Sequence, residues 1–194
     1  MKVLVVHASR HGGTKGIAER IGEVLQKEGL ETSVTGTHDA NWVIGFDAFV
    51  VGSGVYMGHW LGEGIEFLQQ NQMTLSQHPV WLFSSGPLRG SSKEGPASDP
   101  LDNALGPTEG PGSGGRKQLE ALIAAIGPRE HKVFYGAYDP SDPPKVFSER
   151  IVRWMPAARD VLPPGDFRDW DEIEAWARGI AAELARTKTP VGGA

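Results

Sequence analysis

The sequence predicts an α/β protein of three layers, an α/β/α sandwich in which helices cover both faces of a parallel sheet of five strands. Two observations support this fold class. Short apolar runs of strand length alternate with segments whose apolar residues recur at helical spacing. Three of these runs end in polar loops that contain glycine and lead into a helix. Together they indicate β-α units whose strands lie parallel in one sheet.

Composition excludes several classes of protein. The 194 residues include no cysteine, which rules out disulfides, thiol catalysis and cysteine metal ligands. The net charge is −5 and basic residues form no run, so nucleic acid is not the expected partner. No apolar stretch approaches the roughly 18 to 20 residues of a membrane span. The N-terminus has no signal-peptide pattern. We therefore expect a cytoplasmic protein with no transmembrane segment.

The first β-α unit contains the most informative loop. Residues 2–6 form a dense β-branched run, which is typical of a strand buried on both faces. From Lys15 onward a helix is predicted, because apolar residues recur at Ile17, Ile21, Val24 and Leu25. Residues 9–14 join the two with hydroxyl side chains and two adjacent glycines. A strand, a loop of this kind and a helix in that order are typical of an anion site at a helix N-terminus.

Within this loop, Gly12 and Gly13 allow the backbone to approach an anion, and Ser9 and Thr14 add hydroxyl donors. Positive or protonatable side chains nearby are those of Arg10, His11 and Lys15. The alternative is an ordinary strand-to-helix turn with Thr14 as the N-cap. The loop matches neither the G-x-G-x-x-G nor the G-x-x-x-x-G-K-[ST] fingerprint.

The remaining strands follow in order. Residues 31–36 are short and more polar, as expected at a sheet edge, and residues 40–46 are a linking segment. Buried strands are predicted at 46–52, 79–84 and 132–137.

Helices separate these strands. One is predicted to begin at His59, with an apolar face formed by Leu61, Ile65, Phe67 and Leu68. A second covers residues 116–126 and ends at a Gly-Pro pair. The last carries Trp170, Ile173, Trp176, Ile180 and Leu184. A short helix at 146–155 is also predicted, after a proline-rich turn.

We expect one domain over residues 1–186 and a flexible tail over 187–194. Residues 86–115 interrupt the β-α alternation with a stretch rich in glycine, proline, serine and acidic residues. A loop of this length is either functional or disordered. It is interpreted as an insertion over the active face, with simple disorder as the alternative.

In a doubly wound sheet, ligands bind at the carboxyl ends of the strands, where the strand order reverses. The loops at 9–14, 53–59, 84–88 and 136–139 all emerge on that edge. A single site built from several loops is therefore expected.

The segment Ser9-Arg10-His11-Gly12-Gly13-Thr14 is similar to the hydroxyl-x-x-Gly-x-Thr loop that holds the phosphate of flavin mononucleotide (FMN) in flavodoxins. Phe46 to Ser53, followed by Tyr56-x-Gly58-His59, is similar to the third strand and first flavin-flanking loop of one flavodoxin-like family. Residues 163–184 resemble the C-terminal end of that family. The chain thus resembles a flavodoxin-like protein, and more narrowly the flavodoxin-type, menaquinone-dependent protoporphyrinogen oxidases.

The resemblance implies a flavodoxin-like strand order of 2-1-3-4-5 and non-covalently bound FMN. The implied cofactor-binding residues are Ser9, Arg10, His11, Gly12, Gly13, Thr14, Ser53, Gly54, Val55, Tyr56, Met57, Gly58, His59, Ser84, Ser85, Gly86, Pro87, Leu88 and Tyr138. Tyr56 either stacks on the flavin ring or packs on the following helix, and His59 either donates to the ring or caps that helix. Two departures stand out. His11 replaces a hydroxyl residue, and the insertion lacks basic and apolar character.

The expected function is that of a flavin-dependent oxidoreductase or electron carrier, with a redox partner or small-molecule substrate that the sequence does not identify. No catalytic residue is assigned, and the scattered histidines show no metal-ligand spacing. Alternatives are a protein that binds the deazaflavin F420 and a non-enzymatic phosphate-binding signalling module. The signalling module is disfavoured because acidic residues do not cluster after the first strand. A homodimer is left open.

Overall fold

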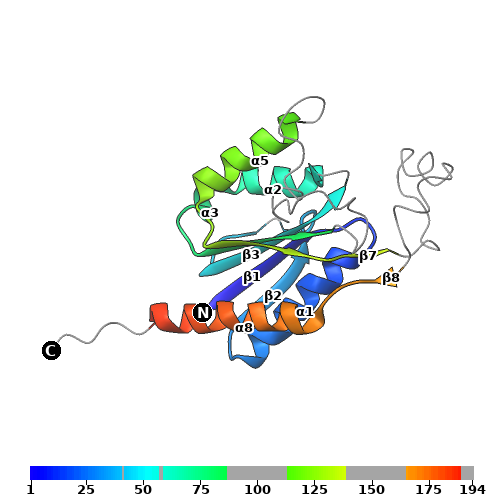
Figure 1. Ribbon diagram of the computed structural model, residues 1–194. Helices are drawn as coiled ribbons and strands as arrows, with labels where there is room; N and C mark the ends of the chain where they lie inside the picture. Colours follow the sequence, from blue (N-terminus) through cyan, green and yellow to red (C-terminus); the bar gives the residue numbers. More distant parts are fainter. Residues whose placement is uncertain (41, 57–58, 87–112, 139–164, 189–194) are drawn as a thin grey trace.

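The computed structural model describes residues 1–40, 42–56, 59–86, 113–138 and 165–188 (Figure 1). Its central feature is a sheet of parallel strands in the order β2-β1-β3-β5-β6. These strands are β1 (Lys2–Ala8), β2 (Glu31–Gly36), β3 (Ala48–Tyr56), β5 (Val80–Ser85) and β6 (Glu130–Phe134). Counting only these five, the order is the predicted 2-1-3-4-5, so the predicted fold class is confirmed.

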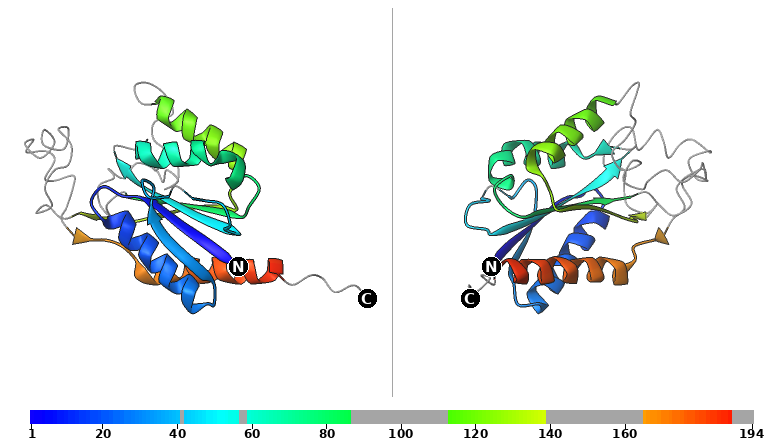
Figure 2. Two further views of the ribbon diagram at one scale, coloured as in Figure 1. Left: turned by 180° about the vertical axis from the view of Figure 1, so that it is seen from behind. Right: turned by 60° about the vertical axis from the view of Figure 1, so that its left-hand side comes forward.

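Helices cover both faces of the sheet, as the three views show (Figures 1 and 2). On one face lie α1 (Gly13–Lys27) and α8 (Trp170–Lys188), and on the other lie α2 (Gly62–Gln70), α3 (Gln72–Leu75) and α5 (Ser113–Ile126). The alternation of faces along each strand divides the core accordingly. In β1, Val3 and Val5 face α1 and α8, whereas Leu4 and Val6 face the opposite layer.

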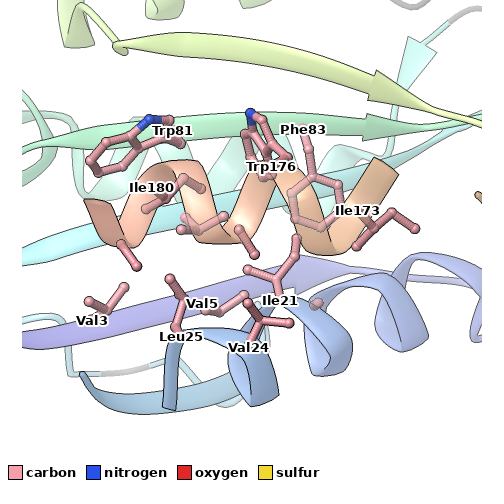
Figure 3. Packing of buried hydrophobic residues seen from close by; sticks show 14 of the residues in the cluster. Val3, Val5, Ile21, Val24, Leu25, Trp81, Phe83, Ile173, Trp176 and Ile180 are labelled. Atoms are coloured by element: carbon pink, nitrogen blue, oxygen red, sulfur yellow. The ribbon is translucent and has the colours of Figure 1, made fainter. Parts of the chain in front are cut away.

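The core beneath α1 and α8 is built from aliphatic and aromatic side chains that point toward one another (Figure 3). Phe83 and Trp176 meet edge to face, with ring centroids 6.3 Å apart. The Phe83 ring also lies directly over Gly52 of the neighbouring strand, because a Cβ atom at Gly52 would stand 2.0 Å from the ring. Glycine at position 52 is therefore what allows this aromatic ring to pack on the sheet.

Several element boundaries differ from the sequence-based prediction. β3 continues to Tyr56, and its end pairs antiparallel with β4 (His59–Trp60), so the next helix begins at Gly62 and not at His59. β6 ends at Phe134, and the following residues form a separate hairpin of β7 (Ala137–Tyr138) with β8 (Gly165–Asp166). α5 begins at Ser113, within the predicted insertion.

Other predictions fall partly or wholly outside the described residues. These are the rest of the insertion, the proline-rich turn, the short helix at 146–155 and the end of the tail. The described part of the C-terminus is helical as far as Lys188, one residue past the start of the predicted tail. Within the described ranges, no helix combines the length and apolar character that crossing a membrane requires.

Candidate functional site

The turn between β1 and α1 has the backbone of an anion-binding loop. Gly12 is the N-cap of α1 and has a φ of 82°, a left-handed conformation that glycine adopts without strain. Among the residues that the structure describes, no side chain caps this helix end, and the first turn contains no acidic residue. The alternative in which Thr14 is the N-cap is wrong, because Thr14 lies inside the helix. A helix start with this backbone and no acidic cap is the kind of helix end to which an anion can bind.

Two hydroxyl groups flank these amides. Ser9 Oγ is buried and has no hydrogen-bond partner among the described residues. Thr14 is also buried, and its Oγ1 lies 3.1 Å from the position that a Cβ atom would take at Gly54. A buried hydroxyl without a partner is unfavourable by about 1–3 kcal/mol, so the Ser9 group is one that a ligand can satisfy.

The β3–β4 hairpin forms a second side of the site. Tyr56 pairs with His59 in this hairpin, and its ring lies beside the anion loop. The ring centroid is 4.8 Å from Arg10 Cζ and 6.2 Å from the centroid of the His11 ring. The structure therefore brings Tyr56, Arg10 and His11 together. Met57 and Gly58, also predicted to contact the cofactor, lie outside the described residues.

His59 has a different environment from the one predicted. It does not cap α2, because it lies in β4, two residues before the helix N-cap. Its Nδ1 atom is buried without a hydrogen-bond partner among the described residues, and lies 3.2 Å from where a Cβ atom at Gly115 would be. His59 thus packs against the first turn of α5, at the end of the predicted insertion.

The predicted serines at the ends of β3 and β5 are engaged by the protein itself. Ser53 Oγ accepts a hydrogen bond from the Leu61 amide at 3.0 Å and lies 3.0 Å from the Gly54 carbonyl oxygen, to which it donates. Ser84 Oγ accepts a hydrogen bond from Trp60 Nε1 at 2.8 Å and forms another with His131 Nε2 at 2.9 Å. Both hydroxyls are therefore satisfied within the protein, at positions where the strands also pair with neighbours on both sides.

His131 is the most perturbed titratable group near this edge. Burial lowers its pKa to about 4, so the imidazole is neutral at pH 7. Burial also lowers the pKa of His7 on β1, an effect that the nearby Glu19 carboxylate opposes. Neither residue was predicted as a site residue, and a half-buried histidine within a strand gives no distinctive sequence signal.

The turn after β6 closes the site on the side of α1. Gly86 donates its amide hydrogen to the Phe134 carbonyl oxygen at 3.0 Å and lies next to Gly136, so the loops after β5 and β6 are in contact. A Cβ atom at Gly13 would stand 3.6 Å from the Ala137 nitrogen, which places β7 against the first turn of α1. Tyr138 continues β7, while Pro87 and Leu88 lie outside the described residues.

Sequence reasoning missed Arg168 and Asp166, which lie beside this turn. Arg168 Nη1 donates to the Gly13 carbonyl oxygen at 3.3 Å. Arg168 also holds Asp166 through two side-chain hydrogen bonds, which lower the pKa of that carboxyl group. The pair stands just before α8 with no motif around it, and only the folded chain shows what it contacts.

These loops meet at the carboxyl edge of the sheet, where β2 and β3 pair with opposite sides of β1. The fold therefore defines a doubly wound α/β protein with a glycine- and hydroxyl-containing loop at its topological switch point, where ligands bind in such sheets. Within the described residues, no three His, Asp or Glu side chains gather as a metal site would require.

The chain belongs to the flavodoxin domain family, whose model matches residues 4–142. Solved structures of similar fold include an archaeal flavodoxin, with a TM-score of 0.56 at 16% identity over 95% of this chain and 99% of that one. The flavodoxin of Streptococcus pneumoniae TIGR4 gives a TM-score of 0.55 at 15% identity, over 96% of this chain and 99% of that one. At these low sequence identities, the structural similarity shows a shared fold alone.

A relative with a named activity is the protoporphyrinogen IX dehydrogenase [quinone] of Escherichia coli K12. It is 26% identical over 87 residues, which cover 43% of this chain and 48% of the relative. The chain therefore matches about half the length of this curated relative.

Proposed function

We propose that this protein binds FMN non-covalently and acts as a flavin-dependent redox protein, with the β1–α1 loop holding the phosphate. The observation that carries the proposal is the buried, unpartnered Ser9 hydroxyl beside the uncapped, left-handed start of α1, among the residues that the structure describes. A phosphate supplies acceptor oxygens for this hydroxyl, for Thr14 and for the helix amides. Its negative charge also suits the positive end of the helix dipole and the Arg10 side chain.

The other loops would frame the ring system. Backbone groups of Ser85 and Gly86 and of the β3–β4 hairpin lie at the same sheet edge as the anion loop. Bound there, the flavin would supply the electron- or hydride-transfer chemistry, and the protein would supply binding, orientation and electrostatics. Tyr56 would contact the cofactor, and the position of its ring beside Arg10 and His11 of the loop supports this role.

Oxidation of a porphyrinogen with a quinone acceptor is the specific activity that we propose to test first. Its support is the match to the Escherichia coli dehydrogenase over 87 residues. Electron transfer between proteins is the alternative, and the flavodoxin structures of similar fold support it. Both would use the same cofactor site, and for both we propose a cytoplasmic location. Porphyrinogen turnover by the flavin-loaded protein, assayed with a quinone, distinguishes them.

Flavin binding is tested by titrating FMN, riboflavin and F420 separately into the purified apo-protein. Ligand fluorescence and visible absorbance serve as readouts. We expect FMN to bind with a yellow colour and to bind more tightly than riboflavin, which lacks the phosphate. Preferential binding of F420 would show that the cofactor is a deazaflavin. If none of the three compounds binds, the proposal is refuted.

The Ser9→Ala variant tests whether the β1–α1 loop holds the phosphate of FMN. Loss of one hydrogen bond to a charged group is worth about 1.5–3 kcal/mol, so FMN affinity should fall at least about tenfold. Ser76→Ala is the matched control, because the Ser76 hydroxyl bonds to the Met73 carbonyl at the exposed end of α3, away from the loop. Equal FMN affinity in the two variants would place the phosphate elsewhere.

A further inference from the structure

The side chain of Arg168 is built into the first turn of α1. Its Nη1 donates to the Gly13 carbonyl oxygen at 3.3 Å, across 155 residues of sequence. The guanidinium group lies against Gly16, where a Cβ atom would stand 2.6 Å from Nη1. Any larger residue at position 16 would displace the guanidinium group, so the contact depends on the absence of a side chain there.

The guanidinium group is itself held in a fixed orientation. Nε and Nη2 donate to the two carboxylate oxygens of Asp166 at 2.7 and 2.6 Å. Its Cζ lies 4.4 Å from the centroid of the Trp170 ring. A two-point ion pair combined with an aromatic contact leaves the planar group little freedom. Only 17% of the Arg168 side chain is exposed, so solvent screens these contacts less than on an open surface.

The segment that carries Arg168 is also joined to the loops of the site. Asp166 pairs with Ala137 in the β7–β8 hairpin, and the Phe167 amide donates to the Gly136 carbonyl oxygen at 3.1 Å. Ala137 in turn lies against Gly13. Gly13, at the start of α1, is therefore contacted both by β7 and by the guanidinium group anchored to β8.

We propose that Arg168, held by Asp166, is a positioning residue that sets the phosphate affinity of the β1–α1 loop. This inference rests on the proposed function. Arg168 acts through the Gly13 peptide and keeps the amides of the first turn aligned for an anion. Phosphate affinity depends on the alignment of several amides at once, so loosening this turn weakens binding of a phosphorylated flavin more than that of the flavin ring alone.

A purely electrostatic role for Arg168 makes a different prediction. If its positive charge simply attracted the phosphate, removing the negative charge of Asp166 would strengthen FMN binding. If the pair positions the turn, Asp166→Asn weakens binding, because the guanidinium group loses its anchor. The sign of this one effect separates the two roles.

The experiment titrates FMN and riboflavin into the 194-residue chain and its Arg168→Met, Arg168→Lys and Asp166→Asn variants, following flavin fluorescence. Arg20→Met is the matched control, because Arg20 also lies on the Trp170 ring, at 5.5 Å, but further along α1. We expect Arg168→Met and Asp166→Asn to weaken FMN binding by about tenfold and riboflavin binding by less than about twofold. Arg168→Lys should restore part of the loss, and Arg20→Met should behave as the wild type.

Three results would overturn the inference. They are unchanged FMN affinity in Arg168→Met, tighter FMN binding in Asp166→Asn, or an equal loss for FMN and riboflavin, which would indicate general disorder of the site. Thermal unfolding of each variant shows that it is folded at the assay temperature. A wild-type protein that binds neither flavin would instead refute the proposed function, so the two failures are distinguishable.

Discussion

Replacing Gly12 by alanine tests the anion loop through the backbone alone. Gly12 has a φ of 82°, and a Cβ atom added there would meet no atom of the described residues within 4 Å. Steric clash with the described part of the protein is therefore excluded, and we expect the change to act through the left-handed conformation. That conformation is unfavourable for alanine by about 1–2 kcal/mol.

Gly29, after the C-terminal end of the same helix, is a closely matched control. Its φ is 83°, and a Cβ atom there would also have no neighbour within 4 Å in the described ranges. Gly12→Ala and Gly29→Ala should therefore lower the free energy of unfolding of the apo-protein by the same amount, about 1–2 kcal/mol. For a chain of this size, each kcal/mol corresponds to a fall in Tm of about 2–4 °C.

FMN binding should separate the two variants. An alanine at position 12 relieves its strain by leaving the left-handed region, and the amides at the start of α1 turn with it. Each hydrogen bond lost to the phosphate is worth about 1.5–3 kcal/mol, so the Kd for FMN should rise at least about tenfold. Gly29→Ala should leave the Kd unchanged. Urea unfolding and FMN titration measure both effects, and equal Kd values for the two variants would refute the assignment of the loop.

Further predictions concern the core and the buried polar network. Gly52→Ala should destabilise the protein by about 1–3 kcal/mol in urea unfolding, because the Phe83 ring occupies the space of the new methyl group; unchanged stability would mean that the ring moves freely. Ser84→Ala should lower the free energy of unfolding by about 1–3 kcal/mol, because it leaves Trp60 Nε1 buried without its acceptor. Ser76→Ala should leave the free energy of unfolding nearly unchanged. His131 has a folded-state pKa of about 4, below its ordinary value of 6.5, so the unfolded chain binds the proton first. The free energy of unfolding should therefore fall as the pH drops from about 6.5 toward 4. His131→Gln should reduce this loss, and an identical pH dependence in the variant would contradict the reasoning.

The strands and their order were predictable because the signals are local. A β-branched run such as that of β1 favours a buried strand whatever surrounds it, and the spacing of apolar residues in α1 leaves one face for the sheet. Repetition of β-α units then restricts the topology, because crossovers between parallel strands are right-handed. The β2 strand was predicted with the bounds that the structure has, Glu31–Gly36.

The elements that were missed depend on distant pairing. β4 is only two residues long and exists because the chain folds back on the end of β3. β7 and β8 are also two residues each, and they join segments that lie far apart in the sequence. Strands this short carry no periodicity that a sequence pattern could reveal. As a result, the sequence placed a helix start at His59, where the structure has a hairpin.

The serines of the site show why residue type and position in a loop do not identify a binding group. Ser9, Ser53 and Ser84 all stand at the carboxyl edge of the sheet and were predicted together. Ser53 and Ser84 lie opposite each other within the sheet, where Leu61 and Trp60 reach their hydroxyls, and both groups are satisfied. Ser9 lies one residue beyond the end of β1, and its hydroxyl has no partner among the described residues. Whether a serine hydroxyl at this edge is bonded by the protein or left without a partner therefore depends on its position relative to the last paired residue of the strand. The strand register determines that position.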